Sequence, residues 1–227
     1  MRNYEKISLL ILFTILSILI IIVLIKLVSL EKKIEYLGGI TTNYVLEKQY
    51  NIYTVDYLPS DEFVLGDEGV SIIMAIIFNY NCPHCRDFFI EIFPQLQEEY
   101  ISKGLVRLAF IEHPNPNLPE LFLSSEAALC ARDQDKYLEF VLHMMQASQT
   151  ISKDDIISVA AKVDLDLELF HLCLENGETK GRLLELLDIA EDLGVKGTPS
   201  LIIGDKLYLG SRSYTEIKNI IDKQLKR

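Results

Sequence analysis

The stretch Ser71-Ile-Ile-Met-Ala-Ile-Ile-Phe78, followed by Cys82-Pro83-His84-Cys85, decides the fold of this chain. The first part is a short apolar run, which predicts a buried central strand. The second part places two thiols one helical turn apart at the start of a predicted helix. That spacing lets the two Cβ atoms approach to about 4 Å, as a disulfide requires. The pair is therefore predicted to switch between dithiol and disulfide.

Cys82 is predicted to be the reactive thiol of this pair. It precedes the helix N-terminus, where unpaired backbone N–H groups and the helix dipole favour a thiolate, and a protonated His84 would add positive charge. Cys85, one turn into the helix, is predicted to be the buried thiol that resolves a mixed disulfide. Pro83 and His84 are expected to tune how strongly the reduced form is stabilised. A purely structural bridge is the alternative.

A C-x-x-C pair can also form half of a zinc site, which needs two further ligands at suitable spacing. The chain has four cysteines and four histidines, but no second C-x-x-C and no cluster of the remaining histidines. We therefore expect redox chemistry with no metal and no cofactor. The alternative of another class is a non-enzymatic module that binds copper or zinc through Cys82, Cys85 and His84, or holds unfolded chains on a helical face.

The first thirty residues indicate a membrane segment. Ile7 to Ile25 are nineteen consecutive residues without a charge, which is about enough helix to cross a bilayer core. The run is longer than a signal-peptide core, and no small-residue cleavage site follows it. Residues 1–29 are therefore predicted to be an uncleaved signal anchor and transmembrane helix, with a cleaved signal peptide or a buried core helix as alternatives.

The compartment follows from the cysteines more than from the charges. Basic residues flank the apolar run on both sides, so the positive-inside rule does not settle the orientation. A site that donates disulfides has little use in a reducing cytosol. We therefore expect a single-pass protein of a bacterial inner membrane with its catalytic domain in the periplasm or an equivalent extracytoplasmic space. A cytosol-facing reductase is the alternative.

Residues 30–50 are predicted to be a helical tether. Leu27, Leu30, Ile34 and Leu37 recur at spacings of three and four until Gly38 and Gly39 end the pattern. Such a stripe could pair with a second copy and form a homo-oligomer. A short stalk, or contact with the catalytic domain, explains the pattern equally well.

The remaining residues, 51–227, are long enough for one domain with its own core. The formal net charge of the chain is −11, and the part beyond the predicted tether is more acidic still. A strongly acidic domain repels phosphate backbones, which excludes nucleic acid as a partner.

The order of predicted elements is strand, helix, strand, helices, hairpin, helix. Pro94 should bend the helix that follows the cysteines. Gly204-Asp205 is suited to a two-residue hairpin turn, and Ser213-Tyr-Thr-Glu216 is a capping box. The predicted strands cover residues 63–65, 71–79, 105–111, 200–203 and 206–209, and the predicted helices cover 83–102, 120–147, 153–163, 166–175, 178–193 and a last segment from 213.

Three further segments accompany the cysteine motif. They are Phe63-Val-Leu-Gly-Asp-Glu-Gly69, Gly197-Thr198-Pro199-Ser200, and the helical stretch that contains Ala127-Ala-Leu-Cys-Ala131 and Lys136-Tyr-Leu-Glu-Phe140. With Ile76–Cys85, they make the chain resemble the DsbA-like thiol:disulfide oxidoreductases of the thioredoxin superfamily over about residues 50–227. The resemblance implies an α/β thioredoxin fold with a helical insertion at about 118–193.

The resemblance also implies roles and partners. Thr198 and Pro199 would form the cis-proline loop that faces the cysteines and binds substrate, and Cys130 and Cys173 would form a structural disulfide, with two buried free thiols as the alternative. The implied function is to introduce disulfide bonds into unfolded or reduced exported proteins, with reoxidation by a DsbB-like membrane quinone oxidoreductase. Threonine before the proline also occurs in isomerases, so disulfide isomerase or reductase activity stays open.

One position departs from the family pattern. Many relatives carry a buried carboxylate on the central strand six residues before the first cysteine, where it helps to move the proton of the resolving thiol. This chain has Ile76 there. Water or Glu112 could replace that carboxylate, whereas Asn79 cannot titrate.

Overall fold

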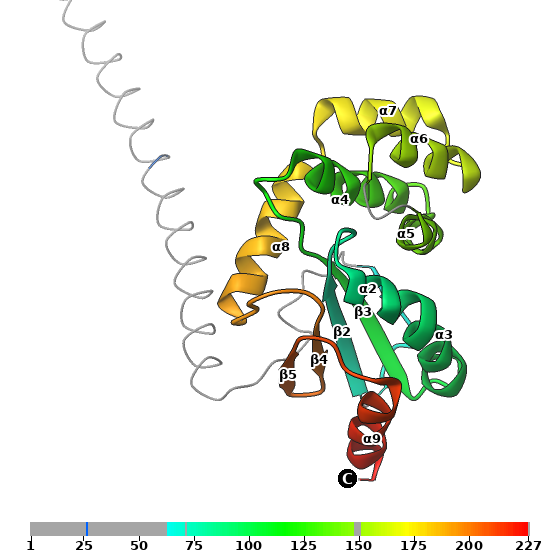
Figure 1. Ribbon diagram of the computed structural model, residues 1–227, viewed down its shortest axis with the longest axis vertical. Coiled ribbons are helices and arrows are strands. Elements are labelled where there is room, and N and C mark those ends of the chain that lie inside the picture. The colour runs from blue at the N-terminus through cyan, green and yellow to red at the C-terminus, as the bar shows by residue number, and fades with distance from the viewer. Residues whose placement is uncertain (1–25, 27–62, 71, 148–150, 227) are drawn as a thin grey trace, which may run out of the picture. The chain divides into compact units, whose positions relative to one another are not determined.

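A computed structural model describes residue 26 and residues 63–70, 72–147 and 151–226 (Figure 1). The predicted anchor, apart from Lys26, and the predicted tether lie outside these residues, so the transmembrane helix stays a prediction. Within the described ranges, each helix falls short of the length or the apolar character that a bilayer span requires. The residues from 63 onward belong to one folded unit.

A mixed sheet forms the centre of this unit. Its strands are β1 (Val64–Leu65), β2 (Ile72–Phe78), β3 (Val106–Glu112), β4 (Ser200–Ile203) and β5 (Lys206–Leu209), arranged in the order β1-β3-β2-β4-β5. β2 and β3 run parallel along their whole length, whereas β1, β4 and β5 pair antiparallel with their neighbours. β2 and β3 are almost continuously apolar because helices cover both faces of the sheet.

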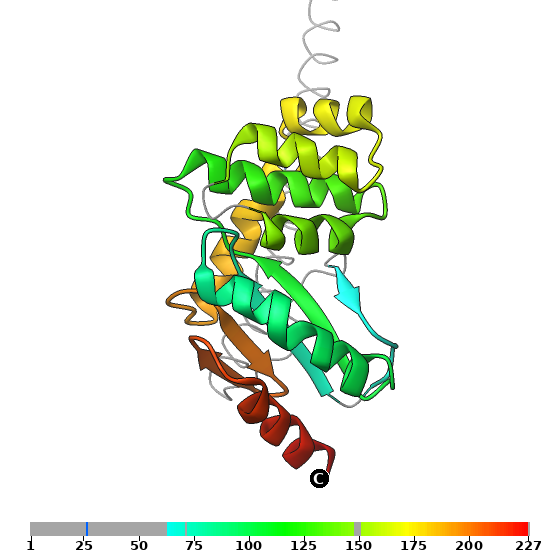
Figure 2. The ribbon, with the colours of Figure 1, turned by 45° about the vertical axis from the view of Figure 1, so that its right-hand side comes forward.

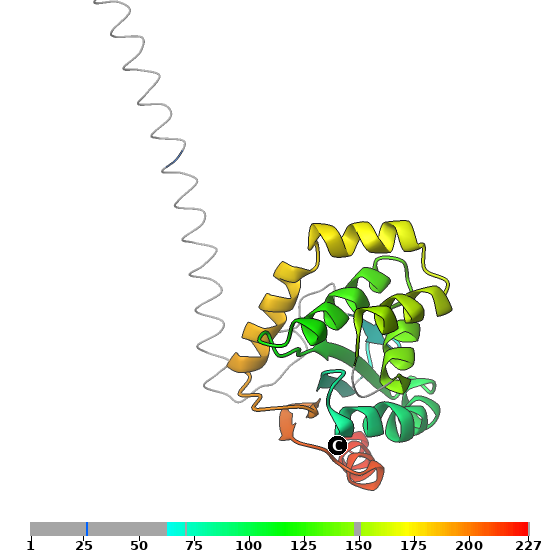
Figure 3. The ribbon, with the colours of Figure 1, turned by 45° about the horizontal axis from the view of Figure 1, so that its top comes forward.

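The helices that follow the cysteines lie on one face of the sheet together with the C-terminal helix, while α8 (Lys180–Asp192) lies on the other face (Figures 2 and 3). The first segment comprises α2 (Pro83–Asp87), η2 (Phe88–Ile92), α3 (Phe93–Leu96) and η3 (Gln97–Ile101), and the C-terminal helix is α9 (Tyr214–Leu225). This placement leaves the N-terminus of α2 at the end of β2, so the sheet fixes the position of the cysteine pair.

Four more helices form a layer at one end of the sheet (Figure 1). They are α4 (Pro119–Arg132), α5 (Tyr137–Gln146), α6 (Lys153–Lys162) and α7 (Leu167–Asn176). Side chains cap two of them. Ser152 and Asp155 form a capping box at α6, and the carboxylate of Asp166 accepts two N–H groups at α7. In the sequence, these helices and α8 lie between β3 and β4, so they separate the first three strands of the sheet from the last two.

The structure corrects the prediction of one helix over 120–147. α4 ends at Arg132, and α5 begins at Tyr137. Between them Asp135 has a left-handed backbone (φ 59°), and the N–H of Lys136 donates to the carbonyl of Ala131. Such a residue reverses the chain at a helix end, and aspartate tolerates it better than most side chains do. The apolar pattern continued across the turn because both helices pack on the same core.

Pro94 bends its helix in a specific way. The turn before it, Phe88–Ile92, is wound as a π-helix, and the N–H of Phe93 donates to the carbonyl of Phe88 five residues earlier. Proline cannot donate to the carbonyl four residues before it, and its ring crowds that carbonyl. Widening one turn removes the conflict without ending the helix.

The hairpin and the last helix follow the sequence closely. Ile203 pairs with Lys206 across Gly204-Asp205, and Gly204 has φ +60°, which glycine adopts without steric cost. At α9, Ser213 and Glu216 cap each other's backbone N–H groups, as the predicted capping box requires.

Candidate active site

Cys82 caps the helix that carries Cys85. Its backbone is extended (φ −92°, ψ 112°), and its sulfur accepts a hydrogen bond from the N–H of Cys85 over 3.2 Å. Both cysteines are free thiols in the structure. Cys82 is half-buried and Cys85 is fully buried, so only the first sulfur is open to attack by another protein.

The two thiols have opposite acidities. Hydrogen bonding to the Cys85 side chain, with smaller contributions from Thr198 and from the N–H groups of Cys85 and His84, lowers the pKa of Cys82 to about 6. Burial, together with hydrogen bonding to Cys82, raises the pKa of the Cys85 thiol well above its usual range. At neutral pH the reduced pair therefore holds one thiolate and one thiol, and the negative charge resides on Cys82.

The loop before β4 supplies the facing wall of the site. The Thr198–Pro199 peptide bond is cis, and Cys82, in its protonated form, donates to the carbonyl of Thr198 over 3.3 Å. The structure thus brings Cys82 together with a loop 116 residues later in the chain. The sequence predicted this juxtaposition only through the family resemblance, because nothing in the local chemistry of Gly197-Thr-Pro-Ser points to the cysteines.

Asn79 is a site residue that the sequence did not single out. It lies in the turn after β2, and its side-chain Nδ2 donates to Oγ1 of Thr198 over 3.0 Å. The sequence did offer one signal, because Asn79 lies three residues before Cys82. Asn79 was considered only as a substitute for the missing carboxylate, and an amide cannot carry a proton in that way.

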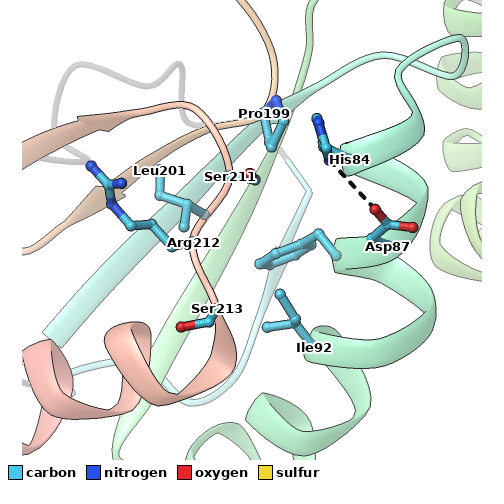
Figure 4. Close-up of a pocket in the computed structure, with 9 residues that line it drawn as sticks. His84, Asp87, Ile92, Pro199, Leu201, Ser211, Arg212 and Ser213 are labelled. Atoms are coloured by element: carbon cyan, nitrogen blue, oxygen red, sulfur yellow. Dashed lines mark ion pairs between the residues drawn. The ribbon is translucent and has the colours of Figure 1, made fainter.

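A pocket opens beside the cysteines on the side of Pro199 (Figure 4). Figure 4 shows His84 and Asp87 on the helical wall and Leu201 on the sheet wall, with the guanidinium of Arg212 turned away from the pocket. His84 Nδ1 and Asp87 Oδ2 lie 3.5 Å apart, and both side chains are largely exposed. The pocket is lined by His84, Asp87, Phe88, Ile92, Pro199, Leu201, Ser211, Arg212 and Ser213. Its lining combines four apolar residues with polar ones, and the apolar part suits an apolar side chain of an extended segment.

The position that departs from the family pattern is core. Ile76 is fully buried in β2, where it pairs with Phe110 and Leu201. The carboxylate that the sequence offered as a substitute has other partners. Glu112 is fully buried at the end of β3 and accepts hydrogen bonds from Tyr80 (2.7 Å), Ser125 (2.8 Å) and Tyr137 (3.1 Å).

These three hydroxyl groups come from different parts of the fold. Tyr80 lies two residues before Cys82, whereas Ser125 and Tyr137 belong to α4 and α5. Burial and the nearby Glu112 carboxylate raise the pKa of Tyr80 well above its usual value, so its hydroxyl stays a donor. Glu112 thus connects the loop that carries the cysteines to the helical layer.

The second cysteine pair lies away from the first. A disulfide joins Cys130 of α4 to Cys173 of α7, with their Cα atoms 6.0 Å apart. Both residues are buried among the helices. Across the described ranges of the chain, no three or more His, Cys, Asp or Glu side chains gather where they could hold a metal ion.

Known proteins with similar sequences and folds identify the relatives of this chain. A family model described as thioredoxin matches residues 60–223. A protein of Bacillus anthracis named "Probable disulfide bond formation protein D" is 28% identical over 171 residues, covering 72% of this chain and 78% of that protein.

Two solved structures show the same arrangement of elements. A thioredoxin-like oxidoreductase from Silicibacter pomeroyi superposes with a TM-score of 0.67 at 27% identity, covering 75% of this chain and 96% of that one. Oxidised BdbD from Bacillus subtilis superposes with a TM-score of 0.68 at 21% identity, covering 78% and 97%.

Proposed function

The chain belongs to the thioredoxin family, among its DsbA-like thiol:disulfide oxidoreductases, and on that premise we propose that it introduces disulfide bonds into exported proteins through Cys82 and Cys85. The family match confirms the resemblance predicted from the sequence, and the fold is thioredoxin-like. The relatives are named as disulfide bond formation proteins, and the enzyme catalyses thiol-disulfide exchange. The observation that carries the proposal is the asymmetry of the pair, in which Cys82 is half-buried with a pKa of about 6 and Cys85 is fully buried.

The transfer begins from the Cys82–Cys85 disulfide. A substrate thiolate attacks Sγ of Cys82, the bond between the two enzyme sulfurs breaks, and Cys85 leaves and takes up a proton. A second substrate thiolate then attacks the substrate sulfur of the mixed disulfide, and Cys82 leaves as a thiolate. The substrate loses two electrons and the enzyme gains them. A leaving thiol of low pKa leaves faster, so this last step is fast. The stability of the Cys82 thiolate that it releases favours oxidation of the substrate.

The loop and the pocket would hold the substrate segment during transfer. The backbone groups of Thr198 lie beside Cys82, where an extended chain could pair with them, as in other strand-addition modes of recognition. The apolar pocket formed by Phe88, Ile92 and Leu201 would take one side chain of that segment. Such contacts use the backbone and one apolar group, which explains how one enzyme could accept many reduced proteins.

Reoxidation needs an electron acceptor that the enzyme itself lacks. We infer a DsbB-like membrane protein that passes two electrons to a quinone, and the predicted anchor would hold the enzyme on the same membrane. The uncharged run Ile7–Ile25 supports this anchoring, and the extracytoplasmic location rests on the need for an oxidising compartment.

The reduction potential tests the direction of the reaction. We expect a value nearer the DsbA value of about −120 mV than the thioredoxin value of about −270 mV, because stabilising the Cys82 thiolate stabilises the reduced form. The chain has no tryptophan, so the titration against glutathione should be followed by alkylation and mass shift. A potential at or below about −230 mV would reject the oxidase and favour the reductase.

Trapping experiments test the roles of the two sulfurs and the compartment. Cys85→Ser should accumulate mixed disulfides with exported proteins through Cys82, and the matched Cys82→Ser variant should trap far less. A reporter fused after Arg227 should be active only in an extracytoplasmic compartment. A cytosolic reporter would overturn the location, and a form cleaved near Ser29 would show that the apolar run is a signal peptide.

A further inference from the structure

Asn79 takes no part in the transfer steps above, yet its side chain reaches the loop that faces the cysteines. Its Nδ2 donates to Oγ1 of Thr198 over 3.0 Å, and it is partly buried. We propose that Asn79 is a positioning residue that directs the hydroxyl proton of Thr198 toward the sulfur of Cys82 and so stabilises the thiolate. This inference rests on the proposed function, because it assumes that Cys82 is the nucleophile.

The proton count of the threonine hydroxyl supports this role. A hydroxyl has one proton to donate and two lone pairs to accept with. When the amide N–H of Asn79 occupies one lone pair of Oγ1, the hydroxyl proton stays available for another acceptor. That acceptor is at hand, because Sγ of Cys82 lies 3.3 Å from the carbonyl oxygen of the same residue, Thr198. Hydrogen bonding to the Thr198 side chain also lowers the pKa of Cys82 and acts in the same direction on Cys85.

The same count explains why an amide suits this position. A carboxylate at residue 79 could only accept, so it would take the hydroxyl proton of Thr198 and place a negative charge near the sulfurs. Both effects would disfavour the Cys82 thiolate. An alanine would leave the hydroxyl free to rotate, so part of the stabilisation would remain.

Titration of the thiolate in the reduced full-length protein, followed by its ultraviolet absorbance, tests the proposal. Thr198→Val and Asn79→Asp should each raise the pKa of Cys82 by about one unit, the size expected for loss of a hydrogen bond to a charged group, and Asn79→Ala should raise it by less. At pH 7, a rise from about 6 to about 7 should shift the glutathione equilibrium about fivefold toward the disulfide.

The double variant Asn79→Ala with Thr198→Val isolates the coupling between the two residues. Asn79→Ala should have no further effect once the hydroxyl is absent. Asn81→Ala is the matched control, because Asn81 lies in the same loop with an exposed side chain, and it should leave the titration unchanged. An equal shift from Asn79→Ala in both backgrounds would overturn the proposal, as would an unchanged titration in Asn79→Ala and Asn79→Asp.

The thiolate titration requires no turnover, so the two proposals can fail separately. Absence of disulfide transfer together with the expected titrations would reject the proposed function and keep the role of Asn79. Normal transfer with titrations that ignore Thr198 would do the reverse.

Discussion

The two cysteine pairs of this protein contain the same atoms in different settings. Cys82 and Cys85 lie at one helix N-terminus, where backbone N–H groups meet a half-buried sulfur. Cys130 and Cys173 are 43 residues apart and join two helices from within their apolar contact. The first setting stabilises a thiolate, which suits the pair to thiol-disulfide exchange, whereas the second shields both sulfurs and suits the bridge to holding two helices together. Exposure and hydrogen-bond donors, more than the cysteines themselves, separate the two roles.

The largest expected difference between the two cysteine pairs is in the rate of disulfide transfer. Cys82→Ser should lower the rate of disulfide transfer to a reduced, unfolded ribonuclease on the order of 10³-fold or more, because a hydroxyl cannot form the mixed disulfide. Changing Cys130 and Cys173 together to Ala should leave most of the rate. Loss of transfer in the second variant, with retention in the first, would place the reactive pair in the helical layer.

The free energy of unfolding should depend on Cys130 and Cys173 and should depend little on the first cysteine pair. The Cys130–Cys173 bridge closes a loop of 43 residues, and its removal should lower the free energy of unfolding by about 4 kcal/mol on the chain-entropy account. Urea unfolding of the oxidised protein and of the double alanine variant would measure this difference. Cys82→Ser is the control, which should show no comparable loss.

Glu112 should hold the loop that carries the first cysteine pair against the helical layer that carries the second. Its carboxylate accepts hydroxyl groups from the cysteine loop and from α4 and α5, and Glu112→Gln replaces an acceptor oxygen with an N–H₂ donor that faces them. A buried polar group left unsatisfied costs about 1–3 kcal/mol, so unfolding in urea should become easier by that amount. Glu98→Gln, on the exposed side of η3, should change little. Equal effects of the two variants would remove Glu112 from this role.

The smallest expected difference between the two cysteine pairs is in how pH affects their reactivity and their contribution to stability. Alkylation of reduced Cys82 should reach half its maximal rate near pH 6, because its pKa is lowered to about 6. A lowered pKa contributes stability that is fully present above the pKa of the unfolded thiol, about 9, and is lost as pH falls through about 6. The thermal midpoint of the reduced form should therefore rise relative to that of the oxidised form between pH 5 and pH 8.

Cys85 does not counteract this trend, because burial raises its pKa and keeps it protonated throughout that range. The Cys130–Cys173 bridge has no proton to lose and is present in both forms. A half-maximal alkylation rate near pH 9, the value used above for the unfolded thiol, would contradict the assignment of Cys82 as the stabilised thiolate.

Local patterns predicted most of the elements of the folded unit. The apolar runs of β2 and β3, the Gly204-Asp205 turn and the Ser213 capping box each carry a local physical preference, and the structure has all four. The break between α4 and α5 was missed, because Asp135 can enter the left-handed region without a glycine to mark it. The anchor and the tether predicted for the first fifty residues rest on the apolar pattern of the sequence, and all of these residues except Lys26 lie outside the described part of the chain.

By itself, the sequence determined the chemistry of the protein, because the Cys82-Pro83-His84-Cys85 spacing places two thiols within bonding reach wherever a helix begins there. Only the tertiary structure decided what surrounds them. Asn79 and Thr198 are 119 residues apart and touch only when β4 pairs with β2, and Glu112 collects hydroxyl groups from three separate segments. Hydrogen bonds between distant segments leave no periodicity in the chain, because they depend on packing of the whole fold and not on local spacing.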